Sequence, residues 1–399
     1  MQPHRCLTLA FDGKTILFAW ELGEGLGHLP ALKAVALGVK ARGAKPVFVL
    51  RDPVLTRAAL ADVDAPILAA PHWPKPAPPS ALSGTYADIL AGNGYGSVEN
   101  LIAQVGAWDQ VYDLIKPDLV VCEHAPTAAL SAFKRIPVAL VGNGFVVPPA
   151  DAAEFPPFEP GKGEPQRQRP VLEVIQTALT GLKRSTPSTI CEPFRGVFRG
   201  IYSFPMLDTY RHARREPVLG PIEPMPAIAP FPMKRRLFAY AAADYALVAE
   251  VTQALMDLGP EASAFFRGSL GARGAVIKSR GVQVYDTAPS LAAVLPEASA
   301  VFSHGGTGFT NAALAAGRPQ VIAPRHFEAY ATARAVEDLG AGIIVQPFEI
   351  KRFKEAVRRA QDDSAVRDAA LNAAATAQTF LAQAAPLDTT LAALGDALG

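Results

Sequence analysis

The sequence has little cysteine and no long apolar run. Its three cysteines, Cys6, Cys122 and Cys191, are far apart and lack metal-ligand spacing. This usage is typical of a reducing compartment rather than of a disulfide framework. No apolar run approaches the ~18 residues of a transmembrane helix, and the first residues lack the apolar core of a signal peptide. We therefore expect a cytoplasmic protein with no transmembrane segment, and peripheral membrane contact is left open.

An excess of charge of either sign is also missing. Lys and Arg together number 38, and Asp and Glu number 37. A nucleic-acid binder needs a basic face, so we expect no nucleic-acid partner. The 399 residues, of which 50% are hydrophobic, are enough for two or three domains with their own cores.

What the sequence does contain is an alternation of short apolar runs with helical patterns. Thr15–Trp20 reads as a strand buried on both faces, residues 29–42 as a helix, and residues 46–50 as the next strand. Such β-α-β units predict parallel sheets with helices on both sides. Further strands are predicted at 119–122, 137–141, 237–241, 275–278, 300–303 and 320–323, and further helices at 127–134, 171–182, 245–258, 308–316, 329–339 and through most of 351–398. Residues 216–232 hold six of the 36 prolines and mark the predicted domain boundary.

The segment from Ser303 to Gly317, SHGGTGFTNAALAAG, combines a strand end, a glycine turn and a helix start. Glycines allow the backbone to approach a ligand, and the N–H groups and dipole of a helix start favour an anion. A diphosphate would fit there, with His304 as a further donor. An ordinary tight β-α turn explains the glycines equally well, because glycine-rich motifs alone are weak.

The motifs of residues 282–345 occur in a recognisable order. They are Asp286-Thr-Ala-Pro289, Leu295-Pro296, His304-Gly-Gly-Thr-Gly308, Gly317-Arg-Pro319, Pro324 and Gly340-Ala-Gly342. This set resembles the nucleotide-sugar signature of the UDP-glycosyltransferase family (glycosyltransferase family 1), bacterial members in particular. The amino-terminal half adds a weaker match at Gly27-His28, Lys116-Pro-Asp118 and Glu123.

The resemblance implies an α/β protein of the GT-B fold, with two Rossmann-like domains whose parallel sheets face each other across a cleft. Residues 1–220 would form the acceptor-binding domain, 221–236 a linker and 237–380 the nucleotide-sugar domain. Residues 381–399 would form a helix that packs back on the first domain. The implied reaction is inverting sugar transfer from a nucleoside diphosphate sugar, UDP-sugar above all, to a small-molecule or lipid-linked acceptor. No metal and no cofactor are expected, and a monomer and a homodimer are both left open.

The resemblance also assigns residues. His28 would be the general base, since its ordinary pKa suits proton transfer, and Glu123 would orient its ring. A helix-start role for His28 and a capping role for Glu123 are the alternatives, and neighbouring His124 is expected to be exposed or to cap a helix. The expected diphosphate site contains His304, Gly305, Gly306, Thr307, Gly308 and Thr310, and the expected sugar or base contacts are Glu328, Tyr285, Thr287 and Ala288.

Two positions depart from the family pattern. Phe309 replaces a Ser or Thr whose hydroxyl touches phosphate, so Thr307 or Thr310 would have to substitute. Glu328-Ala329 replaces the family's Asp-Gln pair. Ala329 cannot hydrogen-bond to sugar hydroxyls, so the sugar preference of the family does not apply to this chain. These two losses motivate a non-catalytic nucleotide-sugar binder as one alternative. A sugar-nucleotide epimerase, which shares the two-domain architecture, is the other. An apolar acceptor pocket is expected among Trp73, Tyr86, Tyr95, Trp108, Phe145, Phe155 and Phe158.

Overall fold

A computed structural model describes residues 10–74, 84–159 and 168–399. Cys6 and the other residues at the start of the chain lie outside these ranges. The chain divides into two compact units. Unit 1 comprises Met1–Glu223 together with Ala385–Gly399, and unit 2 comprises Pro224–Ala384.

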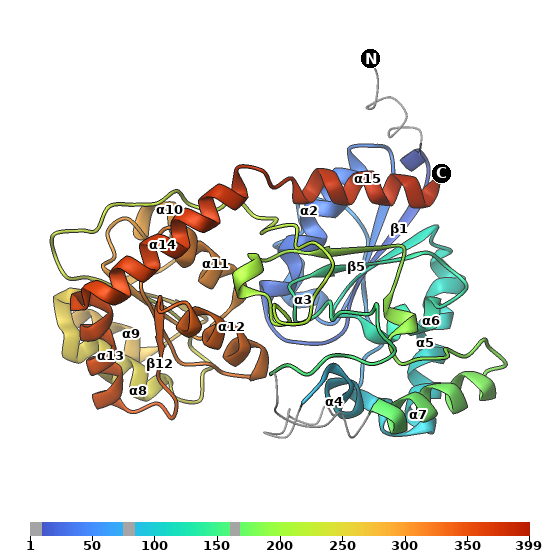
Figure 1. Ribbon diagram of the computed structural model, residues 1–399, viewed down its shortest axis with the longest axis horizontal. Coiled ribbons are helices and arrows are strands. Elements are labelled where there is room, and N and C mark those ends of the chain that lie inside the picture. Colours follow the sequence, from blue (N-terminus) through green and yellow to red (C-terminus); the bar gives the residue numbers. More distant parts are fainter. Residues whose placement is uncertain (1–9, 75–83, 160–167) are drawn as a thin grey trace, which may run out of the picture. The chain divides into compact units, whose positions relative to one another are not determined.

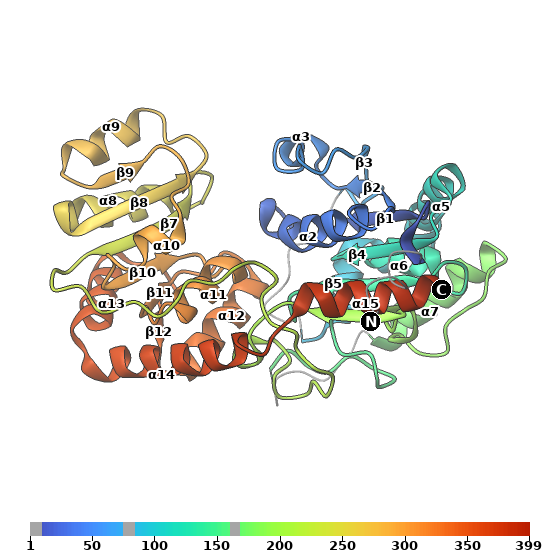
Figure 2. The same ribbon diagram turned by 90° about the horizontal axis from the view of Figure 1, so that it is seen from above.

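Unit 1 contains a six-stranded parallel sheet of order β3-β2-β1-β4-β5-β6, and Figure 2 shows β3, β2, β1, β4 and β5 in this order. This is the order of a doubly wound dinucleotide-binding sheet, in which the direction of winding reverses between β1 and β4. The strands are β1 (Thr15–Trp20), β2 (Lys45–Leu50), β3 (Ile67–Ala69), β4 (Leu119–Glu123), β5 (Val138–Gly142) and β6 (Phe198–Ile201).

Helices cover the sheet because central strands such as β1 are apolar on both faces. Ile16 to Ala19 of β1 have no exposed surface, as expected for a parallel strand packed from both sides. The covering helix α2 buries Leu32, Val35 and Val39 on one stripe. The helices of unit 1 are α2 (Leu29–Lys40), α3 (Pro53–Thr56), α4 (Tyr86–Leu90), α5 (Val98–Ile115), α6 (Pro126–Ala132), α7 (Gln168–Gly181) and α15 (Pro386–Leu398), with the short turns η1 (Leu26–His28), η2 (Ala91–Tyr95), η3 (Glu192–Phe194) and η4 (Pro205–Leu207).

The last helix, α15, belongs to unit 1 although unit 2 separates it from the rest of that unit in sequence. It packs on α2 and β6 (Figure 1). Leu391 and Leu394 are buried in the core of unit 1, and the hydroxyls of Thr390 and Tyr202 are 2.7 Å apart. A side chain at Gly38 of α2 would meet Leu391 at 2.7 Å, so the two helices are in close contact.

Unit 2 repeats the same topology. Its six parallel strands have the order β12-β11-β10-β7-β8-β9, which Figure 2 shows, and the winding reverses between β7 and β10. The strands are β7 (Leu237–Ala242), β8 (Ala262–Arg267), β9 (Gln283–Tyr285), β10 (Ala300–Ser303), β11 (Gln320–Ile322) and β12 (Gly342–Ile344), and the helices are α8 (Val248–Leu258), α9 (Ala272–Ser279), α10 (Leu291–Val294), α11 (Thr307–Ala315), α12 (Phe327–Asp338), α13 (Ile350–Asp362) and α14 (Ser364–Leu381), with the turn η5 (Gly259–Glu261).

One predicted strand is wrong. Residues 275–278 lie in helix α9, of which only Ile277 is buried. A run as short as Ala-Val-Ile does not separate a strand from a helix by periodicity. The next strand of the chain after β7, which pairs with it on the side away from β10, is β8, whose alanines and aromatics gave no alternating signal.

The described parts of the chain contain no helix with the length and apolar character needed to cross a membrane.

Candidate functional site

In unit 1, the carboxyl ends of β1 and β4 bring His28 and Glu123 together. Glu123 is the last residue of β4, and His28 closes η1 and caps α2. Open α/β sheets bind ligands at the carboxyl ends of strands where the winding reverses, and β1 and β4 flank that point. The two residues are 95 positions apart in sequence, so the fold alone makes them neighbours.

The imidazole Nδ1 of His28 lies 2.8 Å from Oε2 of Glu123. Both side chains are buried, at 10% and 5% exposure. Trp20, which is in register with Glu123 on β1, stacks on the His28 ring at a centroid distance of 5.1 Å and 24°. The carboxylate and the indole together fix the ring orientation, so that Nδ1–H donates to Glu123 and Nε2 is the nitrogen that can accept a proton.

Gly23 borders that second nitrogen. Its φ of +84° favours glycine, and a Cβ there would lie 2.2 Å from Nε2 of His28. No real Cβ tolerates such a distance, so the glycine is required for this ring position. The glycine-rich loop after β1 thus approaches the catalytic candidate itself.

Glu21 is a buried carboxylate that sequence reasoning missed. It accepts hydrogen bonds from the Trp108 indole N–H at 2.5 Å and from the Thr127 backbone N–H at 2.7 Å. Burial raises the pKa of Glu21 to about 7, although these donors oppose the shift. Leu22 N–H donates to the carbonyl of His124 at 3.0 Å. Glu21 therefore fastens the start of the His28 loop to α6 and its preceding turn. The position of Glu21 immediately after an apolar strand is the sequence feature that could have indicated its role.

The expectation for His124 is wrong, because its side chain is neither exposed nor a helix cap. It is 6% exposed, and its ring lies 5.8 Å from the ring of His28 and 6.0 Å from that of Phe145. Its φ of +45° turns the chain after β4 and directs the side chain inward. The rings around it form one buried aromatic cluster, which comprises His124, Tyr86, Phe145, Phe155, Phe158, Phe194 and Tyr210.

The other aromatics expected in an acceptor pocket lie elsewhere in unit 1. Trp108 binds Glu21 and packs on Tyr112 at 5.7 Å. Tyr95 donates to Thr127 at 3.4 Å, and Trp73 is half-buried. Only four of the seven predicted residues therefore belong to the cluster beside His28.

In unit 2, His304 and Gly305–Thr310 form the turn from β10 into α11. Gly305 has φ +80°, and a Cβ there would meet the carbonyl oxygen of Ala329 at 2.7 Å, whereas a Cβ at Gly306 would meet nothing within 4 Å. Gly306 caps α11. The turn therefore has open space beside the first N–H groups of a nine-residue helix, which is the geometry that suits an anion.

His304 is neutral in this arrangement. Its Nδ1 donates to the Ala323 carbonyl at 3.2 Å, and its Nε2 accepts from the Ala242 N–H at 3.4 Å. Burial lowers the pKa of His304 to about 4, and the charge of Arg325 adds to this shift. Because Nε2 carries no proton in this tautomer, His304 could donate to a phosphate only after Nε2 gains a proton and the Ala242 contact gives way.

Phe309 and Thr310 point into the protein. Phe309 is 7% exposed and stacks on Tyr240 at 5.2 Å and 13°. The Thr310 side chain is fully buried, and its hydroxyl has no hydrogen-bond partner among the described residues. The suggestion that Thr310 replaces the hydroxyl lost at Phe309 is therefore not supported by its position. Thr307, by contrast, is the first residue of α11.

The remaining donor candidates are spread along the sheet. Glu328 lies in the first turn of α12, after β11. Tyr285 ends the edge strand β9 and packs edge-on against Phe238 at 6.1 Å. Thr287 and Ala288 follow as exposed loop residues. Tyr285, Thr287 and Ala288 are therefore separated from the β10–α11 turn by strands β7 and β8.

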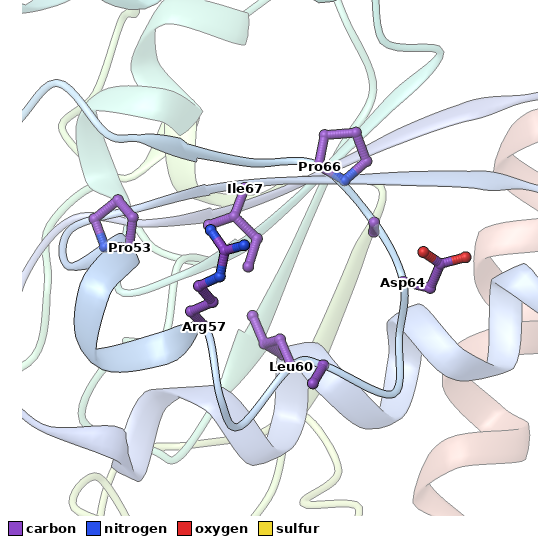
Figure 3. A pocket seen from close by; sticks show the side chains of 8 residues that line it. Pro53, Arg57, Leu60, Asp64, Pro66 and Ile67 are labelled. Carbon is purple, nitrogen blue, oxygen red and sulfur yellow. The ribbon is translucent and has the colours of Figure 1, made fainter.

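A hollow of about 600 Å³ lies apart from both sets of residues, between α3 and β3 of unit 1. Figure 3 shows Pro53, Leu60, Pro66 and Ile67 among its walls. Its charged members are Arg57 and Asp64, which are both exposed. It has none of the convergent buried polar groups expected of a ligand site.

Comparison with known proteins identifies the fold. CalG4, the calicheamicin glycosyltransferase, superposes with a TM-score of 0.68 at 20% identity, over 96% of this chain and 98% of that one. SsfS6 of Streptomyces sp. SF2575, complexed with thymidine diphosphate, gives 0.60 at 20% identity, over 94% and 98%. The chain has the GT-B glycosyltransferase fold. The predicted α/β fold with two Rossmann-like domains is thereby confirmed.

Sequence similarity is concentrated in the second half of this GT-B chain. Residues 277–392 match the family described as erythromycin biosynthesis protein CIII-like, C-terminal domain. ElmGT, the elloramycin glycosyltransferase of Streptomyces olivaceus, is 49% identical over 79 residues, or 18% of this chain. That match spans 20% of the length of ElmGT. The predicted resemblance to glycosyltransferases is confirmed.

Proposed function

We propose that this protein is an inverting, metal-independent glycosyltransferase that moves a sugar from a nucleoside diphosphate sugar to a small apolar acceptor. The hydrogen bond between His28 and Glu123 carries the proposal, because it joins a proton acceptor to the carboxylate that orients it at a ligand-binding edge. UDP-sugars and dTDP-sugars are the donors to test, since SsfS6 was solved with thymidine diphosphate.

In the proposed reaction, Nε2 of His28 removes the proton of an acceptor hydroxyl as its oxygen attacks the anomeric carbon. The new bond forms on the face opposite to the leaving group, and the diphosphate departs with the electron pair of the broken C–O bond. Glu123 stabilises the imidazolium that results. The N–H groups at the start of α11 stabilise the leaving diphosphate.

The aromatic cluster supports an apolar acceptor. Its rings adjoin His28 through His124, and aromatic side chains with few polar groups are typical of sites for apolar small molecules. The similarity to proteins named calicheamicin glycosyltransferase and elloramycin glycosyltransferase supports a small-molecule acceptor.

The test is transfer from UDP- and dTDP-sugars to a panel of polycyclic alcohols and phenols. We expect His28→Ala to abolish transfer and Glu123→Gln to lower kcat by about 100-fold or more, while nucleotide binding is unchanged. Exposed Glu173→Gln on α7 is the matched control. A product with inverted configuration at the anomeric carbon would support the inverting mechanism. Full activity in EDTA would support metal independence. Full turnover by His28→Ala would overturn it, conversion of donor alone would indicate an epimerase, and binding without turnover would indicate a non-catalytic binder.

A further inference from the structure

Four adjacent strands of unit 2 each place one polar or charged residue at the same sheet edge. Arg325 follows β11, His304 follows β10, Asp244 follows β7, and Arg267 is the last residue of β8. Tyr245, next to Asp244, lies against the His304 ring at a centroid distance of 4.0 Å. The four residues lie at the carboxyl ends of their strands, and the winding reverses between two of these strands, β7 and β10. Such sheets bind ligands at this point.

Two guanidinium groups converge on one oxygen atom at this edge. Oδ1 of Asp244 lies 3.2 Å from a guanidinium nitrogen of Arg325 and 3.8 Å from one of Arg267. Arg325 also lies over the Tyr245 ring at 5.8 Å. The two arginines come from segments 58 positions apart (325 − 267), so their convergence on one point is a product of the fold.

The positive charge at this edge belongs to the arginines. His304 is neutral through burial, and Phe309 and Thr310 present no hydroxyl to the surface. The pairing with Asp244 contributes little to stability, because the Asp244 side chain is 67% exposed and exposed ion pairs are weak. A guanidinium binds a phosphate more strongly than it binds an exposed carboxylate, since it can donate two parallel hydrogen bonds to the more highly charged group.

We propose that Arg325 and Arg267 bind the diphosphate of the donor, and that the Asp244 carboxylate occupies their meeting point until the diphosphate displaces it. This subsite rests on the proposed function. It replaces the phosphate contact that Phe309 cannot make, and it identifies Arg325 and Arg267 as determinants of donor affinity that lie outside the glycine turn.

The proposal assigns opposite effects to the two kinds of residue. Arg325→Gln and Arg267→Gln each weaken the binding of UDP and dTDP, by about tenfold, because a charge-assisted hydrogen bond to phosphate is lost. Asp244→Asn strengthens binding several-fold, because the competing carboxylate is gone. The dependence of log Kd on log salt concentration becomes shallower in the arginine variants, since fewer charges face the anion.

The experiment is isothermal titration of the full chain with UDP and with dTDP at low and high salt. The controls are Arg235→Gln and Asp362→Asn, an exposed ion pair of the same unit with a 2.7 Å contact, in which Arg235 precedes β7. Both controls should bind as the wild type does.

The outcomes separate this subsite from the proposed function. Weaker binding by both arginine variants with tighter binding by Asp244→Asn supports the subsite, even if no acceptor is found. Wild-type affinity in Arg325→Gln and Arg267→Gln overturns it and leaves the glycosyltransferase proposal standing. Weaker binding by Asp244→Asn overturns the proposed competition between the Asp244 carboxylate and the diphosphate, and indicates that Asp244 itself contacts the nucleotide. A wild-type chain that binds neither nucleotide overturns the subsite and the proposed function together.

Discussion

Gly23 lies against the imidazole of His28, and a Cβ at this position would be 2.2 Å from Nε2. Gly23→Ala should therefore displace the ring or the loop, and the φ of +84° adds strain. Since a misplacement of about 1 Å can cost about 100-fold in rate, we expect a loss of transfer of at least that order, measured as kcat/KM. Gly27→Ala is the control, because a Cβ at Gly27 meets nothing within 4 Å. Equal activities of the two variants would contradict the requirement for Gly23.

Phe309 is a core residue of unit 2, so restoring the family's hydroxyl should harm the protein. Phe309→Ser removes the ring that stacks on Tyr240 and buries a hydroxyl. We expect a loss of about 3 kcal/mol or more in the free energy of unfolding, with no gain in nucleotide affinity. Thermal unfolding measures the first and titration the second. Phe309→Leu, which keeps most of the volume, should cost less than about 1.5 kcal/mol. Tighter nucleotide binding by Phe309→Ser would contradict the inward position of Phe309.

His304 should make unit 2 sensitive to acid. Its pKa is about 4 in the folded protein against an ordinary value of 6.5. Between these values the unfolded chain binds more protons than the folded one, so stability falls as the pH is lowered from 6.5 to 4. After allowance for partial exposure of the ring, we expect a contribution on the order of 1–2 kcal/mol.

His304→Gln tests this dependence by urea unfolding at pH 7 and pH 4.5. The variant should lose less stability between these two pH values than the wild type does. His212→Gln, at an exposed histidine of unit 1, should behave as the wild type. Parallel pH profiles of His304→Gln and the wild type would mean that His304 does not titrate in this range.

Arg214 holds the loop after β5 in unit 1. Its side chain, 2% exposed, donates to Asp208 at 2.7 Å and to the Val147 carbonyl at 2.9 Å. Arg214→Met leaves the buried Asp208 carboxylate without its cation, and we expect about 3–5 kcal/mol of lost stability. Thermal unfolding checks this, with exposed Arg215→Met as control. The double variant Arg214→Met, Asp208→Leu should recover part of the loss, and a double variant as unstable as the single one would argue against an uncompensated charge.

The sequence predicted the alternation of elements well where strands are buried on both faces. The bounds of β1 and β10 agree with the prediction, because continuous apolar runs leave few other structures. Short edge strands such as β3 and β12 were missed, since three residues carry no periodic signal. Residues 275–278 were misassigned for the same reason.

The candidate site was predictable only in part. The resemblance paired His28 with Glu123, and the structure places them 2.8 Å apart. Glu21 and His124 depend on which way a side chain turns after a strand end, and composition does not determine that direction. The convergence of Arg267 and Arg325 on Asp244 needs the order of four strands, which no local pattern contains.

The return of α15 to unit 1 has a consequence for biosynthesis. A ribosome makes residues 224–384, and with them all of unit 2, before it makes the segment that covers α2 and β6. Until then the surface around Gly38 that receives Leu391 is open to solvent, and a nascent chain with such an apolar surface is prone to aggregate or to recruit chaperones. Unit 1 therefore completes its folding only after unit 2 has been synthesised, although most of unit 1 is translated first.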